Sequence, residues 1–425
     1  MNVYFDTIGC RLNQSEIEQY ANQFRLAGHH IVMTAAEADM VIINTCTVTV
    51  EAASDSRQKI RQAARAGNAQ IVLTGCWSTM EPDDAALMEH VTHIIPNHEK
   101  DQLVATVLSQ PQELFDREPL AREPLPGIHQ RTRAFLKAQD GCDNHCTYCI
   151  THIARGAGRS RLLAEVLKDA HAAVEGGSKE LVLTGVHLAS WGKDFDPPLT
   201  LRNLVQAVLD QGGMQRLRLS SVEPWDLHDN FFAVWADGRM CRHIHLPLQS
   251  GSAGVLRRMA RNTTPTAYRT LVETIRRMVP QVAITTDIIV GFPGETEDEF
   301  SESLEFVREI SFAAGHVFAY SARNGTPAAR MNRQVPHAIR KERSRKMRDV
   351  IAASSLEYRQ QFIGTQTSVL WESTDGLGSQ GWRLQGLTDN YLRISASSKF
   401  KLWNQISRVK ILAIQGDGFS GEIID

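Results

Sequence analysis

The sequence predicts an α/β protein in three parts: an N-terminal parallel sheet with helices, a central complete or partial barrel of parallel strands, and a small C-terminal β-barrel. Short apolar runs alternate with helical patterns through the first hundred residues and again from about residue 134, as in parallel sheets. After residue 360 the helical patterns give way to short strands with turns that contain Gly, Asp and Asn. The chain of 425 residues is long enough for about three domains.

The first domain is expected over residues 1–115. Its expected strands are Val3–Phe5, Met40–Ile43 and Gln70–Leu73, and its expected helices are Ser15–Ala27 and Arg57–Ala66. Residues 116–133 form the expected linker, because Pro, Glu and Arg recur in this part of the chain without periodicity.

The central domain is expected over residues 134–360. Its expected strands are Glu180–Leu183, Arg216–Leu219, His243–Leu246, Ala283–Ile289 and His316–Ala319, and its expected helices are Leu163–Glu175, Leu201–Gln211, Thr266–Met278 and Glu297–Ile310. Successive strand and helix units predict a barrel with its active site at the carboxyl ends of the strands. The last domain, 361–425, has expected strands at Thr367–Trp371, Gly381–Leu384, Tyr391–Ile394 and Val409–Ile414.

The net charge of −2 gives the chain no overall attraction for nucleic acid. The segment Arg330–Arg359 is nevertheless strongly basic, which indicates either a phosphate-binding track or a solvated helix face. No window reaches the roughly 18 apolar residues of a membrane span, and the start of the chain lacks a signal-peptide pattern. We therefore expect a cytoplasmic protein with no membrane partner.

Three of the seven cysteines lie in one short loop: Cys142, Cys146 and Cys149. Disulfides are rare in the cytoplasm, so metal binding or catalysis is the better expectation. Three thiolates can hold three irons of a four-iron cluster and leave the fourth iron open for a chelating ligand. The alternative is a zinc site completed by His145 or His152, although zinc sites favour paired Cys-x-x-Cys motifs.

This loop resembles the signature of the radical S-adenosylmethionine superfamily, with Tyr148 as the aromatic residue before the last cysteine. The resemblance implies a [4Fe-4S] cluster whose open iron binds S-adenosylmethionine. It also implies reductive cleavage of that cofactor to a 5′-deoxyadenosyl radical.

Three further cysteines, Cys10, Cys46 and Cys76, each follow an expected strand of the first domain. Because the ends of parallel strands emerge at one edge of a sheet, these thiols are expected to converge and to make a second set of three ligands. The alternative is that they are small apolar residues of the core. The remaining cysteine, Cys241, is expected to be a buried bystander.

The segments Thr7–Glu16, Asn44–Cys46 and Thr74–Cys76 are similar to the N-terminal domain of the methylthiotransferases. The resemblance covers nearly the whole chain and extends to a C-terminal RNA-binding β-barrel of the TRAM type. It implies a second, auxiliary [4Fe-4S] cluster that carries the sulfur to be transferred. It further implies a methylthio group placed on an unreactive carbon after that carbon has lost hydrogen to the radical.

Four other residues are expected to bind the cofactor. By the resemblance, Glu223 and Gln249 occupy positions near the active cavity, and the turn at Gly291 lets the backbone approach an adenine. Arg155 is expected to neutralise a phosphate or the cofactor carboxylate. The residues Ile150–Ile153 depart from the family pattern, which puts the packing of the loop in doubt but not its cysteines.

The family divides by substrate. The segments Lys137–Cys142, Ala154–Gly156 and Gly386–Tyr391 look most like the branch that modifies N6-threonylcarbamoyladenosine at position 37 of tRNA. Isopentenyladenosine in tRNA and an aspartate of a ribosomal protein are the alternatives. A non-enzymatic RNA-binding iron–sulfur redox sensor is the rival from another class. The sequence identifies neither the electron donor nor the sulfur source.

Overall fold

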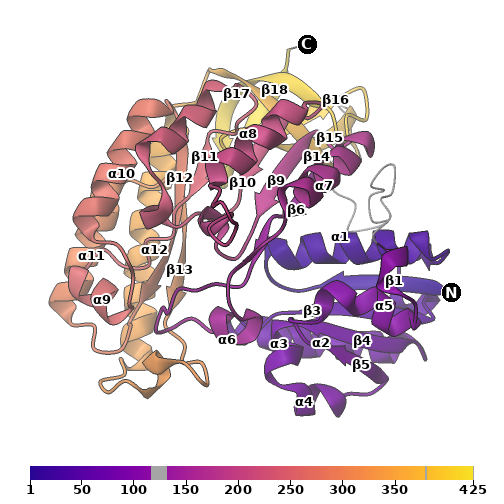
Figure 1. Ribbon diagram of the computed structural model, residues 1–425. Coiled ribbons are helices and arrows are strands. Elements are labelled where there is room, and N and C mark those ends of the chain that lie inside the picture. The colour runs from indigo at the N-terminus through magenta and orange to yellow at the C-terminus, as the bar shows by residue number, and fades with distance from the viewer. Residues whose placement is uncertain (116–131, 379–380, 425) are drawn as a thin grey trace.

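A computed structural model describes residues 1–115, 132–378 and 381–424 of the chain. Figure 1 shows three parts: an N-terminal sheet with helices, a central arc of parallel strands with helices outside it, and a C-terminal β-barrel. The expected linker lies outside the described residues except for its last two, Thr132 and Arg133.

The N-terminal domain is a parallel sheet in the order β2-β1-β3-β4-β5. Its strands are β1 (Asn2–Thr7), β2 (His30–Ile31), β3 (Met40–Thr45), β4 (Gln70–Gly75) and β5 (Val91–Ile95), and its helices are α1 (Arg11–Leu26), α2 (Val50–Ala66), α3 (Cys76–Met80), α4 (Pro82–Ala86) and α5 (Leu103–Leu108). Helix α2 begins seven residues before the expected start at Arg57. The Thr49 side chain explains this start, because it accepts a hydrogen bond from Ala52 N and so caps the helix.

The central arc contains six parallel strands. They are β6 (Arg133–Lys137), β9 (Glu180–Thr184), β10 (Arg216–Leu219), β11 (His243–His245), β12 (Ala283–Val290) and β13 (Ala314–Ala319). Isolated bridges join β10 to the β11 region, and no pairing joins β13 to β6 in the described part of the chain. The barrel is therefore partial, the second of the two forms that the sequence predicts.

Helices follow the strands of the arc and lie on its outer face (Figure 1). They are α7 (Leu163–Glu175), α8 (Leu201–Gln211), α10 (Pro265–Met278) and α11 (Glu297–Ile310), with the shorter α6 (Thr151–Arg155) and α9 (Ala253–Arg258) in loops. A two-stranded ribbon, β7 (Gln139–Asp140) with β8 (Arg159–Ser160), flanks the three-cysteine loop. This ribbon brackets the loop at the carboxyl end of β6.

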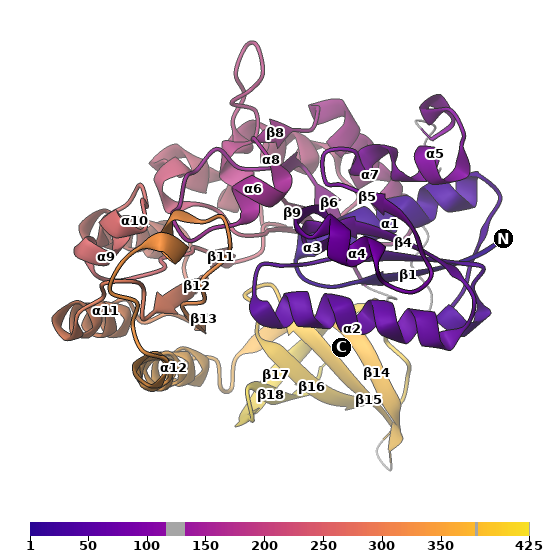
Figure 2. The same cartoon turned by 90° about the horizontal axis from the view of Figure 1, so that it is seen from below.

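The basic segment forms the long helix α12 (His337–Gln360), which leads into the C-terminal barrel (Figure 2). That barrel closes in the order β14-β15-β16-β18-β17. Its strands are β14 (Gln366–Gly378), β15 (Gly381–Thr388), β16 (Arg393–Ser398), β17 (Ile406–Gln415) and β18 (Gly418–Ile423). The sequence analysis missed β18 because glycines interrupt its pattern; a Cβ on Gly421 would lie 2.5 Å from Val409 Cγ1, so the packing requires glycine there.

All three parts are in contact. Ser15 Oγ of α1 donates to the carbonyl of Phe135 (2.7 Å), and Arg216 Nη1 of β10 donates to the carbonyl of Leu387 in the C-terminal barrel (2.9 Å). No helix among the described residues has the length and apolar character that crossing a membrane requires. The contacts place the carboxyl ends of the central strands between the two terminal domains.

Candidate active site

A cavity of about 840 Å³ lies where the three parts of the chain meet. Its lining includes Cys10, Cys46, Cys76, His245, Asp287 and Tyr391. Because the active sites of parallel barrels lie at the carboxyl ends of the strands, this cavity is in the position where chemistry is expected.

The three cysteines of the N-terminal domain converge on this cavity. Cys10 precedes α1, Cys46 follows β3, and Cys76 begins α3 directly after β4. The first two loops are in close contact, because a Cβ on Gly9 would lie only 2.6 Å from Cys46 Sγ. Gly9 has a φ of +100°, a conformation that favours glycine. The sheet edge thus brings together three thiols that are far apart in sequence.

Two asparagines hold these cysteines in place. Asn13 Oδ1 accepts a hydrogen bond from Cys10 Sγ (3.5 Å), and Asn13 Nδ2 donates to the carbonyl of Thr45 (3.1 Å), next to Cys46. Asn97 Nδ2 donates to Cys76 Sγ (3.7 Å). Hydrogen bonds of this kind orient metal ligands and tune them electronically.

The thiol chemistry fits an iron–sulfur cluster. All three cysteines are free, and burial raises the pKa of Cys46 to about 12. A thiol of this kind is a weak acid until a metal displaces its proton. The N–H donor from Asn97 to Cys76 is suited to a cluster thiolate.

Cys142, Cys146 and Cys149 lie in the loop between β7 and α6 and are partly exposed. The loop is held by its backbone: Cys142 N donates to Gly156 O (3.1 Å) and Cys149 N donates to Cys146 O (3.0 Å). Two donors point at sulfur, Thr151 N at Cys149 (3.4 Å) and Arg261 Nη1 at Cys146 (3.9 Å). These contacts also fit thiolate ligands of a cluster.

The zinc alternative has little support in this geometry. Within residues 1–115, 132–378 and 381–424, no three His, Cys, Asp or Glu side chains gather closely enough to share one metal ion. In a four-iron cluster each thiolate binds a different iron, so the three sulfur atoms lie farther apart than they would around a single ion.

A second cavity, of about 560 Å³, adjoins the first, since Val48, Thr151, Asp287 and Phe318 line both. Its lining also includes Tyr148, Cys149 and Gln249, three residues that the sequence analysis selected. The three N-terminal cysteines and Cys149 of the loop set therefore line two adjoining cavities.

Glu223 lies beside the cysteine loop. It pairs with Arg261 Nη2 (2.9 Å), the same guanidinium that reaches Cys146 and stacks over Trp225. Gln249 has a φ of +71°, and its backbone hydrogen bonds with both Asp287 and Ile289 fix its place in the barrel. Gln249 also lines the second cavity beside Cys149.

Gly291 and Arg155 have structural partners that the sequence did not indicate. At Gly291, where φ is +69°, a Cβ would lie 2.3 Å from Arg340 Cγ, so α12 packs tightly there. Arg155 is buried and donates to Asn13 Oδ1 (2.5 Å) and Asp140 Oδ1 (2.9 Å). Its guanidinium therefore binds protein groups on the N-terminal side of the cavity, although the sequence predicted that it would bind a phosphate or the cofactor carboxylate.

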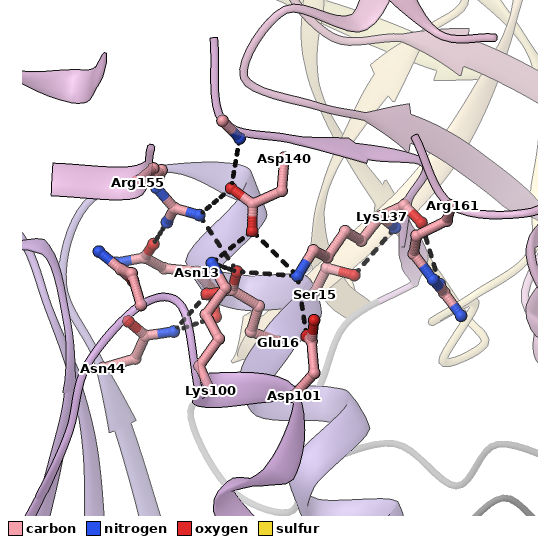
Figure 3. A network of polar contacts seen from close by, with 12 residues as sticks. Asn13, Ser15, Glu16, Asn44, Lys100, Asp101, Lys137, Asp140, Arg155 and Arg161 are labelled. Atoms are coloured by element: carbon pink, nitrogen blue, oxygen red, sulfur yellow. Dashed lines mark hydrogen bonds and ion pairs between the residues drawn. The ribbon is translucent and has the colours of Figure 1, made fainter. Parts of the chain in front are cut away.

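A buried ionic network joins the N-terminal domain to the central arc (Figure 3). Lys100 Nζ lies 2.6 Å from Glu16 and 2.5 Å from Asp140, and Lys137 and Arg155 complete the set. Burial alone would raise the pKa of Glu16, but the three surrounding cations lower it to about 2. The Glu16 carboxylate is therefore ionised at neutral pH.

The network connects the two cysteine sets. Asp140 Oδ1 accepts from the N–H of Gly141, which precedes Cys142, while Arg155 grips Asn13, which supports Cys10. Sequence reasoning selected Arg155 but missed the side chains that it meets, Asn13 and Asp140, because they are separated from it along the chain. The one available signal was local: Asn13 lies three residues after Cys10, and Asp140 two before Cys142.

Two family models match the chain. The uncharacterized protein family UPF0004 matches residues 2–95, and the radical SAM superfamily matches residues 136–307. The range matched by the first model contains Cys10, Cys46 and Cys76, and the range matched by the second contains the three-cysteine loop.

Similar proteins cover almost the whole chain. The threonylcarbamoyladenosine tRNA methylthiotransferase MtaB of Bacillus subtilis is 34% identical, over 96% of this chain and 93% of its own. The protein of the same name from Thermotoga maritima is 37% identical, over 87% and 86%. The tRNA-2-methylthio-N(6)-dimethylallyladenosine synthase of Desulfitobacterium hafniense is 33% identical, over 90% and 88%.

Among solved structures, the radical S-adenosylmethionine methyltransferase TsrM from Kitasatospora setae is similar in fold, with a TM-score of 0.57, 14% identity and 77% of each chain covered. This likeness concerns the fold alone. The family models and the full-length relatives together show more: the chain belongs to the radical S-adenosylmethionine methylthiotransferase family, in the threonylcarbamoyladenosine branch.

Proposed function

We propose that this enzyme converts N6-threonylcarbamoyladenosine at position 37 of tRNA to its 2-methylthio derivative. The observation that carries the proposal is that the three N-terminal cysteines line one cavity and Cys149 of the loop set lines a cavity that adjoins it. Full-length relatives named for this activity support the choice of substrate.

The proposed cofactors are two [4Fe-4S] clusters and S-adenosylmethionine. Cys142, Cys146 and Cys149 would hold the cluster that binds S-adenosylmethionine, and the N-terminal three would hold the auxiliary cluster. Cleavage of the bound cofactor supplies the one-electron chemistry that an adenine C2–H bond needs, since that bond is neither acidic nor electrophilic.

The protein's own side chains would position this chemistry. Tyr148 and Gln249 line the cavity next to Cys149 and would contact the cofactor there, with the Gly291 turn nearby. Glu223, held by Arg261, would orient polar groups of the cofactor. Arg155 would act from the other side, by fixing Asn13 and the loop of Cys10.

The proposed partner is tRNA. Helix α12 carries most of the basic residues of the 330–359 segment and exposes Lys341, Arg345 and Arg348, whereas Arg343 is buried against Glu295. The closed barrel after it suits an RNA-binding domain of the TRAM type. We propose the boundaries 1–115, 134–360 and 361–425 for the three domains and the cytoplasm as the location. An electron donor and a sulfur source are further partners that the proposed reaction requires.

The test is anaerobic reconstitution of the full chain with iron and sulfide, followed by S-adenosylmethionine, a reductant and tRNA that carries threonylcarbamoyladenosine. Nucleosides from the digested tRNA are read by mass spectrometry. A 2-methylthio adduct on that nucleoside is the expected result. Formation of 5′-deoxyadenosine without the adduct would contradict the proposed substrate.

Isopentenyladenosine in tRNA is the second candidate substrate, because relatives with comparable coverage are named for its dimethylallyl equivalent. The same digest distinguishes the two when tRNA with each modification is supplied separately. A protein that forms no 5′-deoxyadenosine with either tRNA would instead fit the redox-sensor alternative.

A further inference from the structure

Four arginines line the cavity of about 840 Å³, and three of them are bound by carboxylates or by backbone carbonyl oxygens of the described residues. Arg155 pairs with Glu16 and Asp140, and Arg393 pairs with Asp417 (3.1 Å). Arg359 donates to two carbonyl oxygens. The exception is Arg11, the residue after Cys10, whose one hydrogen-bond partner among the described residues is a hydroxyl: its Nη2 donates to Tyr391 Oη (3.0 Å).

The charges around Tyr391 leave Arg11 as the surplus cation. Arg218 is paired with Glu180 (2.6 Å), and Arg133 is paired with Glu372 (2.6 Å). No carboxylate in the described part of the chain pairs with Arg11. A largely buried guanidinium stays protonated, so an unpaired one favours an incoming anion.

The Arg11 guanidinium is also accessible. Its Nε and Nη1 have no acceptor among the described residues, and neither atom is sealed from the cavity. Tyr391 holds the group in place, because its ring stacks on His243 with 4.5 Å between centroids and an interplanar angle of 14°. The N-terminus of the 16-residue α1, where Arg11 lies, adds positive potential.

We propose that Arg11 binds the carboxylate of the threonylcarbamoyl group and thereby selects this substrate over one with an uncharged N6 substituent. The inference deepens the proposed function and rests on it. In adenine, C2 and C6 flank N1 on one edge of the ring, so an amino acid linked through N6 lies on the same side as the carbon to be modified. Arg11, adjacent to Cys10, is therefore on the side where a carboxylate would lie while C2 faces the N-terminal cysteines.

Selectivity follows from the cost of leaving Arg11 unpaired. A planar guanidinium can bind a carboxylate through two parallel hydrogen bonds. An isopentenyl group offers no anion and would bury the cation without a partner. Tyr391 serves as a positioning residue that acts through Arg11.

The experiment compares two ligands that differ at one group, which is either anionic or neutral. Reconstituted full-length protein is titrated with tRNA whose threonylcarbamoyl group carries either its natural carboxylate or a neutral methyl amide. Binding is followed by fluorescence anisotropy, and methylthio product is measured in parallel. The wild type is expected to prefer the carboxylate by roughly tenfold to a hundredfold, the range for a charge-assisted pair.

In the variant Arg11→Gln, the ratio of the affinities for the carboxylate and the amide tRNA is expected to fall close to one. Arg11→Lys should retain part of the preference. The matched control is Arg393→Gln, which also removes a guanidinium from the cavity lining. Arg393 is exposed and already paired with Asp417, so this variant should keep the preference for the carboxylate. A wild-type protein that binds both tRNAs equally would overturn the inference even if Arg11→Gln failed to fold. An unchanged preference in folded Arg11→Gln would overturn it as well.

Failure of the proposed function and failure of the Arg11 inference give different results. Absence of methylthio product from wild type and natural tRNA refutes the proposed function, whatever the binding ratio. Product formation with no charge preference leaves the function intact and removes the role of Arg11.

Discussion

The two cysteine sets are built in opposite ways. The loop set spans eight residues, is held by its own backbone and is partly exposed. The N-terminal set comes from three separate strand ends; Cys46 and Cys76 are each only 4% exposed, whereas Cys10 is exposed. The first can be recognised from local spacing, whereas the second exists only when the sheet has folded.

The largest effect is expected from the loop set. Replacement of Cys142, Cys146 and Cys149 with Ala should remove about half of the bound iron and abolish both 5′-deoxyadenosine and methylthio product. Iron analysis and mass spectrometry of both products check this. Any 5′-deoxyadenosine formed at the wild-type rate would show that cofactor cleavage takes place elsewhere.

Gly9→Ala should perturb the N-terminal set alone. Its Cβ would lie 2.6 Å from Cys46 Sγ at a φ of +100°, so the loop of Cys10 must move. A displacement of about 1 Å can cost roughly a hundredfold in rate, so methylthio product should fall by that order while 5′-deoxyadenosine persists.

The matched control for that variant is Gly28→Ala in the same domain. Gly28 also has a positive φ, +79°, but nothing lies within 4 Å of the added methyl group. It should keep methylthio activity. Equal losses in the two variants would show that backbone strain, and not the position of the cysteine, is responsible.

Glu16→Gln should weaken the junction between the two cysteine-bearing domains. Removal of one partner from a buried ionic network costs about 3–5 kcal/mol. The free energy of unfolding, measured with chemical denaturant, should fall by that amount. The control is Glu309→Gln, which breaks an exposed ion pair with Arg269 and should change stability little.

The same network predicts a pH dependence. Glu16 has a folded-state pKa of about 2, below its ordinary value of 4.5, so its contribution is fully present above pH 4.5 and is lost as the pH falls toward 2. The stability of the wild type should therefore decline through this window. Glu16→Gln should show a shallower decline, and identical slopes would exclude Glu16 as the group responsible.

The smallest effect is expected at the seventh cysteine. Cys241 is buried in the central arc, where burial raises its pKa to about 12. Cys241→Ala should cost about 1 kcal/mol of packing and leave iron content and both products unchanged. Loss of iron in this variant would mean that the cysteines do not divide into two sets of three and a bystander.

Sequence periodicity predicted the layers of this fold well, because strand burial and helix amphipathicity are local properties. Strands β9 and β10 and helices α7 and α8 fall within one residue of their expected bounds. The failures have local causes too. Strand β18 is rich in glycine, and the strand expected from Tyr391 begins at Arg393 because Tyr391 adopts a φ of +66° in a turn.

The candidate site also contains residues that the sequence predicts and residues that only the folded structure brings together. The cysteines could be selected from spacing and from their place after strands. The partners that hold them could not, because Asn97, Lys100 and Arg261 meet their targets only through tertiary packing. Arg155 illustrates the limit: its charge was evident in the sequence, but its partners, Asn13, Glu16 and Asp140, were not.

The central claim is that the two cysteine sets divide the work. Its most direct test is the full chain with Cys10, Cys46 and Cys76 all replaced by Ala, reconstituted anaerobically and incubated with S-adenosylmethionine, reductant and threonylcarbamoyladenosine tRNA. The account predicts that 5′-deoxyadenosine is still formed and that the methylthio nucleoside is absent. Methylthio nucleoside at the wild-type level would contradict it.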